Sequence, residues 1–314
     1  MDPETSLRLL VSGRSVVRAA LPGWVGPDAG PPAAADTAAA LGLVRLTPVV
    51  AGPLAAAAAP WRGDLVLAAS AAASQYDALR EVWGRHGTGT RPLAALALAG
   101  SGFHGQHGRP WQTLPGNLHL AGAWPCDLPA AVGRVLPAWP AVALAEAVAD
   151  LAPLGPEPRI KWVNDVLLGG AKVAGTLTAV RVVAGRIRVV FVGVGLNLAA
   201  APRLVTAGAA LPATALAAVP GGAPSLGVGL ARVLSGLATR FAALDADGPA
   251  SLLADYRRWS AVIGRDVVVW ADGGTGCAPL AAGRVTAIDD GLGLVLAGHP
   301  GSITAGRLEF SESR

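Results

Sequence analysis

Lysine is rare in this chain, and its two lysines stand close together. Of 25 basic residues only Lys161 and Lys172 are lysines, and arginine supplies the positive charge everywhere else. An ammonium is a compact point charge and is not interchangeable with a planar guanidinium. We therefore interpret the pair as part of a site that places point charges beside a phosphate or a carboxylate. Chance placement of two surface lysines is the alternative interpretation.

Both lysines belong to a segment with the pattern of three β-strands. Residues 159–197 contain three apolar runs, which are separated by Gly169-Gly170 and by Ala184-Gly185. Two-residue links that contain glycine are typical of β-hairpins. The segment is therefore predicted to form a three-stranded meander that carries the lysines.

Two-residue turns fix which side chains share a face, because side chains alternate along a strand. In this register Lys172 lies opposite Leu167 and directly across from Asn197. We expect one face to join the core, namely Trp162, Val166, Leu168, Val173, Leu177, Val192, Val194 and Leu196. We expect the other face to bind a ligand, namely Lys161, Val163, Asp165, Lys172, Ala174, Thr176, Thr178, Gly193, Gly195 and Asn197. A slip of one residue would bury Lys and Asp side chains at a high cost in free energy.

Other elements must position this meander. Hydrophobic periodicity predicts strands at 65–68, 93–99 and 117–124 and helices at 75–83, 140–151, 226–243 and 249–259. A glycine-rich loop, GSGFHGQHGRPW, occupies residues 100–111. Short apolar runs at 266–270, 283–288, 292–296 and 303–310 predict a small β-barrel at the end of the sequence.

The chain divides into three parts by this pattern. Residues 1–60 are rich in Ala, Pro and Gly, and we expect a short helix near 36–41 and find no helix-turn-helix pattern there. Residues 61–260 are the expected catalytic domain, and residues 261–314 are the expected C-terminal domain. The predicted fold class is α+β, with a mixed or antiparallel sheet, flanking helices and a separate small β-domain.

Composition narrows the class of protein. With 314 residues, 52% apolar and 15% charged, the chain can bury a large core. The most apolar uncharged stretch, 46–61, is interrupted by prolines, so we expect no membrane span, and we expect a cytoplasmic protein. A net charge of +4 without a basic cluster disfavours a nucleic-acid partner. Cys126 and Cys277 have no zinc-binding spacing and are expected to be free thiols.

Several motifs resemble one family in the same order. KWVNDVLLGGAKVAG at 161–175 is similar to the KWPND and K(V/L)AG segments of biotin protein ligases, and FVGVGLN at 191–197 is similar to their VGIGIN strand. HGRPW at 107–111 resembles the end of their glycine- and arginine-rich loop, and GNLHLA follows as their NLYLS-like strand does. ADYRRWSAVIGRDVVV at 254–269 resembles the entry to their SH3-like C-terminal domain. The resemblance covers residues 61–314.

The resemblance implies a class II synthetase-like biotin/lipoate ligase domain and an SH3-like C-terminal domain. It implies two half-reactions, in which biotin and MgATP give biotinyl-AMP and pyrophosphate, and a lysine of a biotin carboxyl carrier protein domain then attacks the mixed anhydride. Family members often pair through their sheets, so a homodimer is a further implication by analogy.

The resemblance also assigns site residues. The catalytic candidates are Lys172, Arg109 and Lys161. The candidates for binding biotin or another acyl group are Ser74, Gly100, His104, Gly105, Gln106, Lys172, Gly175, Gly193 and Gly195. The candidates for binding ATP are Arg109, Trp111, Lys161, Asn164, Asp165 and Asn197. Asp165 is also the candidate ligand for Mg²⁺.

Departures from the family pattern leave the substrate open. Ala72, Ala73 and Ser74 stand where the family has Ser-Thr-Asn, and His104 and Gln106 stand where it has arginines. Three interpretations therefore stay open. The acid is biotin, the acid is another one such as lipoate, or the chain is a paralogue that binds nucleotide or carrier protein without turnover. Neither cysteine matches a family motif, which disfavours the thioester-forming acyltransferases.

Two further patterns in the loop have weaker interpretations. GSGFHG fits the dinucleotide motif GxGxxG, but prolines follow where that motif requires a helix. His104 and His107 have no third metal-binding residue nearby, so the loop does not predict a metal site.

Overall fold

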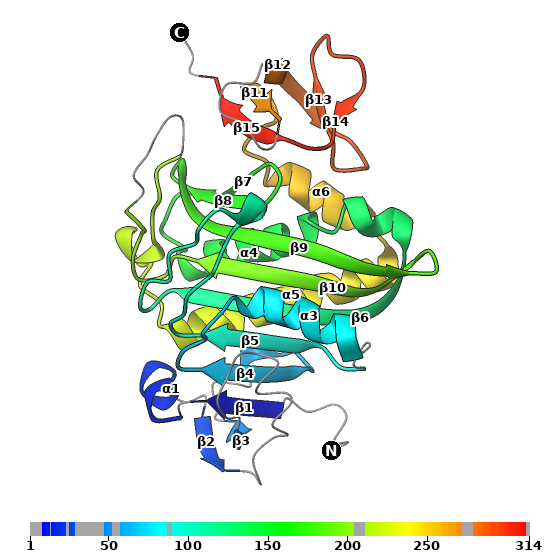
Figure 1. The fold of residues 1–314 in the computed structure, drawn as a ribbon. Coiled ribbons are helices and arrows are strands. Elements are labelled where there is room, and N and C mark those ends of the chain that lie inside the picture. Colours follow the sequence, from blue (N-terminus) through cyan, green and yellow to red (C-terminus); the bar gives the residue numbers. More distant parts are fainter. Residues whose placement is uncertain are drawn as a thin grey trace.

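A ten-stranded mixed sheet runs through the middle of the molecule (Figure 1). The structure is a computed structural model and describes residues 8–12, 14–22, 25–28, 47–51, 57–86, 90–203, 211–271 and 279–311. The helix expected at 36–41 and Cys277 lie outside these residues. Within them, Cys126 is a free thiol, as expected.

The strand order in this sheet is β2-β3-β1-β4-β5-β6-β10-β9-β8-β7. The β1–β4 and β4–β5 pairs are parallel and the other pairs are antiparallel, which confirms the predicted fold class. The strands are β1 (Arg8–Ser12), β2 (Val25–Asp28), β3 (Thr47–Ala51), β4 (Asp64–Ala68), β5 (Leu93–Ala97), β6 (Leu118–Pro129), β7 (Arg159–Lys161), β8 (Asp165–Leu168), β9 (Ala171–Val183) and β10 (Arg186–Leu196).

The described N-terminal residues extend this sheet at the β4 edge. β1 pairs with β4 over five residues, from Arg8 opposite Asp64 to Ser12 opposite Ala68, and α1 (Arg14–Ala20) follows β1. β3 and β2 continue the sheet beyond β1. The hydrogen-bonded ladder is therefore continuous across residue 60, and the division of the chain at that residue remains a prediction.

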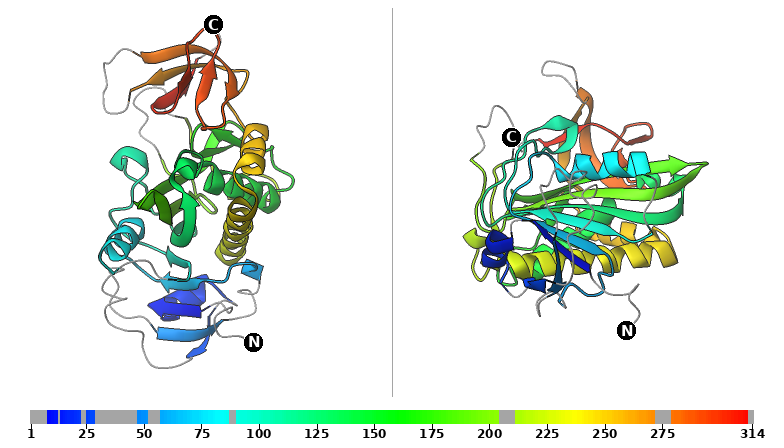
Figure 2. Two further views of the ribbon diagram at one scale, coloured as in Figure 1. Left: turned by 90° about the vertical axis from the view of Figure 1, so that its right-hand side faces the viewer. Right: turned by 60° about the horizontal axis from the view of Figure 1, so that its bottom comes forward.

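Helices cover both faces of the sheet (Figure 2). α3 (Gln75–His86) lies on one face, and its Leu79 and Trp83 pack on small residues of the strands such as Ala95 and Ala123. The other face carries the main core beneath α4 (Ala138–Leu151), α5 (Leu226–Asp247) and α6 (Ala250–Arg258). Short 3-10 turns lie at Gln106–Gly108, Ala130–Arg134 and Leu216–Ala218.

The long helix α5 has clear stop and start signals. The hydroxyl of Ser225 accepts the backbone N–H of Val228, and Gly248 ends the helix with a φ of 76° that favours glycine. By length and composition alone α5 could cross a membrane, and it is the one such helix among the described residues. Its residues Leu230, Leu234 and Leu237 are buried in the main core, as in the core helix of a globular domain.

Strands β8, β9 and β10 form a meander with the two predicted turns. The first predicted strand is not continuous: it breaks at residues 162–164 into β7 and β8, which pair with each other, and two bulges also change the register. Both turns have positive φ at both central residues, and Lys172 pairs with Leu167 as expected. A bulge between Val166 and Leu167, and a second between Ile187 and Val189, each shift the pairing by one residue. The prediction that Lys172 faces Asn197 is therefore wrong: the backbone N–H of Asn197 donates to Val173 O at 2.9 Å.

The same shift exchanges side chains between the two faces of β9. Gly175 pairs with Gly195 and Leu177 pairs with Gly193, so Leu177, expected in the core, belongs to the ligand-facing side. Ala174, expected on that side, is fully buried in the main core, and Thr176 is 3% exposed. A bulge reverses the alternation beyond it, and two-residue turns in the sequence do not reveal that it is there.

The C-terminal residues form a separate five-stranded antiparallel sheet, which is consistent with a small β-domain. Its order is β14-β13-β12-β11-β15. The strands are β11 (Asp266–Trp270), β12 (Pro279–Ile288), β13 (Leu294–Leu296), β14 (Ser302–Ile303) and β15 (Arg307–Phe310). This sheet lies beyond α6 and β7, at the end of the molecule away from β1–β3 (Figure 1). The SH3-like assignment remains a prediction.

Candidate active site

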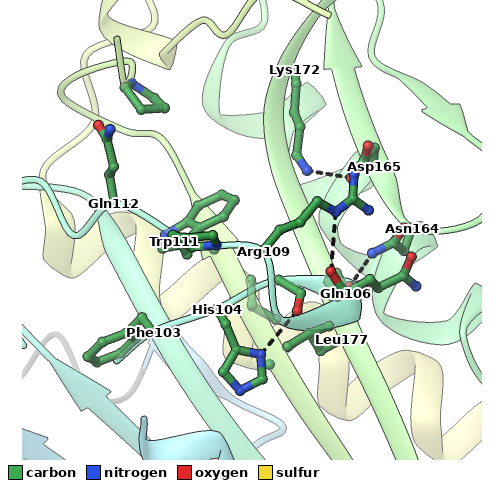
Figure 3. A pocket seen from close by; sticks show the side chains of 18 of the residues that line it. Phe103, His104, Gln106, Arg109, Trp111, Gln112, Asn164, Asp165, Lys172 and Leu177 are labelled. Atoms are coloured by element: carbon green, nitrogen blue, oxygen red, sulfur yellow. Dashed lines mark hydrogen bonds and ion pairs between the residues drawn. The ribbon is translucent and has the colours of Figure 1, made fainter. Parts of the chain in front are cut away.

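A cavity of about 380 Å³ lies between the loop 100–111 and the ligand-facing side of the meander. Figure 3 shows the loop on one side of this cavity and the strands with Lys172 and Asp165 on the other. Every site residue expected from the sequence lines the cavity except Gly100. Gly100 instead packs against the ring of Phe103 and accepts a hydrogen bond from Thr113, so it shapes the loop.

The meander contributes a compact group of charges. Lys161 at the end of β7 pairs with Asp165 at the start of β8, and the ammonium of Lys172 lies 2.6 Å from Asp165 Oδ1. Burial alone would raise the pKa of Asp165, but the positive charges of Lys172 and Lys161 outweigh burial and hold that pKa below its usual range. Asp165 is therefore ionised, with the Lys172 ammonium as its ion-pair partner and Lys161 near enough to help lower its pKa.

The ammonium of Lys161 is buried at the cavity and has a lowered pKa. Burial is the largest effect and lowers the pKa of Lys161, while Asp165 opposes it and the charge of Lys172 lowers the pKa further. Among the described residues, neither Lys161 nor Arg109 forms an ion pair. These two cations line the cavity without carboxylate partners there, which suits the binding of an anion.

Trp111 ends the loop and lies beneath Lys172. The Lys172 ammonium is 5.7 Å from the centre of the indole ring, within range of a cation–π interaction. A Cβ on Gly195 would lie only 2.3 Å from Trp111 Cζ2, so the indole rests directly on the backbone of β10. The Trp111 N–H donates to Phe103 O at 2.9 Å, and its indole N–H donates to His119 Nδ1 at 3.1 Å. The ring is thus fixed on several sides.

His104 faces α3 as well as the cavity. Its Nε2 lies 2.7 Å from Asp77 Oδ2, and its Nδ1 lies 3.0 Å from the Gly105 carbonyl oxygen. The hydrogen bonds to Gly105 and Asp77 raise the pKa of His104. Because both ring nitrogens face acceptors, only the doubly protonated imidazolium satisfies both contacts. His104 therefore joins the loop to the first turn of α3.

Two asparagines have mainly backbone partners. Asn164 Nδ2 donates to the carbonyl of Thr176, which joins the β7–β8 link to β9. Asn197 is 2% exposed, donates to Thr214 O at 3.0 Å and accepts a hydrogen bond from Asn117 at 3.3 Å. Both line the cavity while they hold its walls together.

The loop residues Gly105, Gln106 and Arg109 line the cavity through a tight turn. The Gly105 N–H donates to Arg109 O at 2.7 Å, and Arg109 Nε donates back to Gln106 O at 3.2 Å. Figure 3 shows the Arg109 side chain reaching across toward Asp165 and Lys172. Ser74, just before α3, lines the cavity at the other side of the loop and accepts a long hydrogen bond from Asp77 N.

Sequence reasoning missed the apolar lining and the contribution of the C-terminal sheet. Tyr76, Phe103, His119, Ala121 and Leu177 line the cavity, and His119 and Ala121 alternate along β6. That alternation was available as a signal within GNLHLA. A further part of the lining comes from β15, namely Arg307, Leu308 and Glu309. No local signal in the sequence could bring β15, which begins 146 residues after Lys161, to the same cavity.

Side-chain contacts join the C-terminal sheet to the rest of the described chain. Trp162 Nε1 donates to Leu292 O at 2.8 Å, and Arg257 forms an ion pair with Asp290 at 2.7 Å. Within the C-terminal sheet, Glu309 accepts the indole N–H of Trp270 at 2.8 Å and forms an ion pair with Arg307. The segment that carries Lys161 therefore also anchors the second sheet.

Comparisons with known proteins agree with this fold and motif order. Residues 90–197 match the model of the biotin/lipoate A/B protein ligase family. The chain is 35% identical over 173 residues to the biotin--[acetyl-CoA-carboxylase] ligase of Mycobacterium tuberculosis, covering 54% of this chain and 61% of that protein. It is 32% identical over 115 residues to the bifunctional ligase/repressor BirA of Bacillus subtilis, covering 35% and 33%. The chain thus spans between a third and about three fifths of these relatives.

Solved structures match over nearly their whole length. Biotin protein ligase from Aquifex aeolicus in complex with biotin and ATP matches with a TM-score of 0.61 and 17% identity, covering 79% of this chain and 99% of that one. The Leishmania major enzyme in complex with biotin matches with a TM-score of 0.51 and 17% identity, covering 80% and 98%. The fold is that of the biotin protein ligases. Over residues 90–197 the sequence is similar to the biotin/lipoate A/B protein ligase family.

Proposed function

We propose that this protein is a biotin protein ligase, which activates biotin with ATP and transfers it to a lysine of a biotin carboxyl carrier protein domain. The observation that carries the proposal is the convergence of Lys172, Lys161 and Arg109 around one cavity that also has an apolar end. The cations suit phosphates and a carboxylate, and the apolar end suits the tail of the acid. The family match and the named relatives support the same activity.

The first half-reaction forms a mixed anhydride. A carboxylate oxygen of the acid attacks the α-phosphorus of ATP, the bond to the bridging oxygen breaks, and pyrophosphate leaves. Negative charge grows on the phosphate oxygens, and the ammonium of Lys172 is placed to offset it. Asp165 and the Trp111 ring hold that ammonium in place. Lys161 and Arg109 bind the remaining phosphate charge in this scheme.

The second half-reaction uses the carrier. The neutral amine of a carrier lysine attacks the acyl carbon, an amide forms, and AMP leaves with the electron pair of the broken C–O bond. The protein contributes no covalent intermediate in this scheme. Cys126 does not line the cavity, and burial raises its thiol pKa to about 11, so a thioester route through this residue is disfavoured.

Magnesium fits this site as a companion of ATP. The described residues contain no cluster of three or more His, Cys, Asp or Glu side chains able to hold a metal. Mg²⁺ commonly uses one or two carboxylates together with substrate phosphates. Asp165 is the residue that would hold it, in competition with Lys172, and the metal would supply charge neutralisation on the phosphates. The proposal also includes a cytoplasmic location and, by analogy, a homodimer; a nucleic-acid partner and a membrane are not part of it.

A second candidate keeps the chemistry and changes the acid. The apolar end of the cavity is lined by Tyr76, Phe103 and Leu177, and Ala72 and Ala73 stand where the family has hydroxyl side chains. The Ala72 carbonyl already accepts a hydrogen bond from Ser101 Oγ at 2.8 Å. Fewer polar partners for a ureido ring favour a less polar acid such as lipoate.

Isotope exchange between pyrophosphate and ATP tests the proposal directly. We expect biotin to support exchange, because exchange requires only the first half-reaction. Exchange with lipoate or an aliphatic acid alone would replace biotin by the second candidate. No exchange with any acid, from a chain that still binds ATP, would contradict both and favour a non-catalytic paralogue.

A further inference from the structure

His119 makes a contact that the proposed chemistry does not use. This residue lies on β6, is 2% exposed, and accepts the indole N–H of Trp111 at its Nδ1, 3.1 Å away. Because tryptophan can only donate, His119 Nδ1 must be unprotonated. Burial lowers the pKa of His119 to about 4, which keeps this nitrogen available at neutral pH. The neutral imidazole that this contact requires is therefore the form present at neutral pH.

His119 also contacts Phe103 in the loop 100–111. The centres of the Phe103 and His119 rings are 5.9 Å apart, and Phe103 O accepts the backbone N–H of Trp111. One imidazole on a sheet strand therefore contacts two loop residues that are themselves hydrogen-bonded to each other. The β6–β10 ladder fixes this imidazole, with His119 paired to Gly195. Strand β6 therefore holds His119 in place, and His119 in turn restricts the position of the loop.

Trp111 connects His119 to Lys172, because its indole ring contacts both residues. The indole lies against Gly195, where no side chain intervenes, and the Lys172 ammonium lies above the ring. A rotation of the indole would remove the surface beneath Lys172 and open the space beside β10. The Trp111–His119 hydrogen bond opposes that rotation because the acceptor lies at one defined position of the ring edge.

We propose that His119 is a positioning residue, which holds the Trp111 indole on β10 so that Lys172 keeps its place above the ring. This inference rests on the proposed acid activation for its catalytic consequence. The contact itself can be tested without any substrate. His119 does not need to touch the reacting atoms, and its effect passes through Trp111.

The test compares two substitutions that differ in one property. In His119→Asn the amide oxygen can occupy the place of Nδ1 and accept the indole N–H, whereas His119→Leu has no acceptor. The ¹⁵N-labelled indole signal of Trp111, assigned by its loss in Trp111→Phe, reports the bond in the free protein. We expect slow hydrogen exchange of this N–H in the wild type and in His119→Asn, and exchange faster by about tenfold in His119→Leu.

Kinetics then separate positioning from general destabilisation. For pyrophosphate exchange we expect kcat/KM to fall by about tenfold to a hundredfold in His119→Leu and by no more than about threefold in His119→Asn. Both variants should show the circular-dichroism spectrum of the wild type. Wild-type indole exchange in His119→Leu, or an equal loss of kcat/KM in both variants, would overturn the proposal. If the wild type shows no pyrophosphate exchange, the acid-activation proposal fails, and the indole signal alone decides whether His119 holds Trp111.

Discussion

The two walls of the cavity are held in different ways. The meander wall places Lys161, Asp165 and Lys172 on strands whose backbones are hydrogen-bonded on both sides or anchored to the C-terminal sheet. The loop wall at 100–111 is held by separate contacts instead of a continuous ladder, among them those of Trp111 with His119 and of His104 with Asp77. Charges that must be placed accurately lie on the rigid wall. The loop wall, which has no continuous ladder of hydrogen bonds, carries Arg109 and the Trp111 ring.

The largest effect should come from the rigid wall. Replacing Lys172 with alanine removes the ammonium beside Asp165, and we expect pyrophosphate exchange to fall by about a thousandfold. Lys172→Arg is the matched control, because it keeps the charge but not the compact ammonium, and it should remain strongly impaired. The measurement is the exchange rate at saturating ATP, with the circular-dichroism spectrum as a check of folding. Near wild-type exchange in Lys172→Ala would contradict the role of the meander charges.

Substitutions at two glycines of β10 test the contact between the two walls. A Cβ at Gly195 would lie 2.3 Å from Trp111 Cζ2, whereas a Cβ at Gly193 would lie 3.3 Å from Leu177 Cβ. We expect Gly195→Ala to displace Trp111 and to lower kcat/KM by about a hundredfold, because small displacements in a site carry large kinetic effects. Gly193→Ala should have a much smaller effect. Equal losses in the two variants would show that the Trp111 contact is not what matters.

The loop wall should respond to pH through His104. The folded-state pKa of His104 is raised above 6.5, so its bond with Asp77 is fully present below that pH and is lost as the pH rises through the folded pKa. Asp77, the Gly105 carbonyl, the Tyr76 ring and the opposing charge of Arg80 face this imidazole. We expect KM for the acid to rise about threefold from pH 6 to pH 9, because exposed charge pairs contribute little.

Asp77→Asn is the control for this pH response. It should raise KM at pH 6 and flatten the dependence on pH, since the asparagine no longer favours the imidazolium. The profile of KM against pH in the two proteins is the measurement. A pH dependence that survives unchanged in Asp77→Asn would assign the titration to another group.

The smallest effect should come from the hydrogen bond between Trp162 and Leu292, which links β7 and β8 to the C-terminal sheet. Trp162→Phe removes the donor to Leu292 O, and loss of one hydrogen bond of this kind should lower the free energy of unfolding by about 1 kcal/mol. Denaturant titration gives that number. Trp270→Phe, which removes the bond to Glu309 within the C-terminal sheet, is the comparison. A change in KM for ATP in Trp162→Phe but not in Trp270→Phe would show that the Trp162–Leu292 contact also positions β15 at the cavity.

The sequence by itself determined the meander and the identity of its charged side chains. Two glycine-bearing turns and alternating apolar residues were enough to predict the hairpins β8–β9 and β9–β10 and to place Lys172 and Asp165 on one side, because hairpin geometry is local. The turn between β7 and β8, which places Lys161 opposite Asp165, was not predicted. Most helices and the strands of the C-terminal sheet follow from local periodicity in the same way. The family resemblance added the loop residues.

Only the tertiary structure decided the exact faces and the distant partners. The bulges that move Leu177 to the cavity and Ala174 to the core arise from pairing between strands, and their cost and benefit depend on neighbours far along the chain. His104 meets Asp77, and β15 reaches the cavity, because separate elements pack together there. Local periodicity constrains one element at a time, whereas a contact between elements depends on how both are packed.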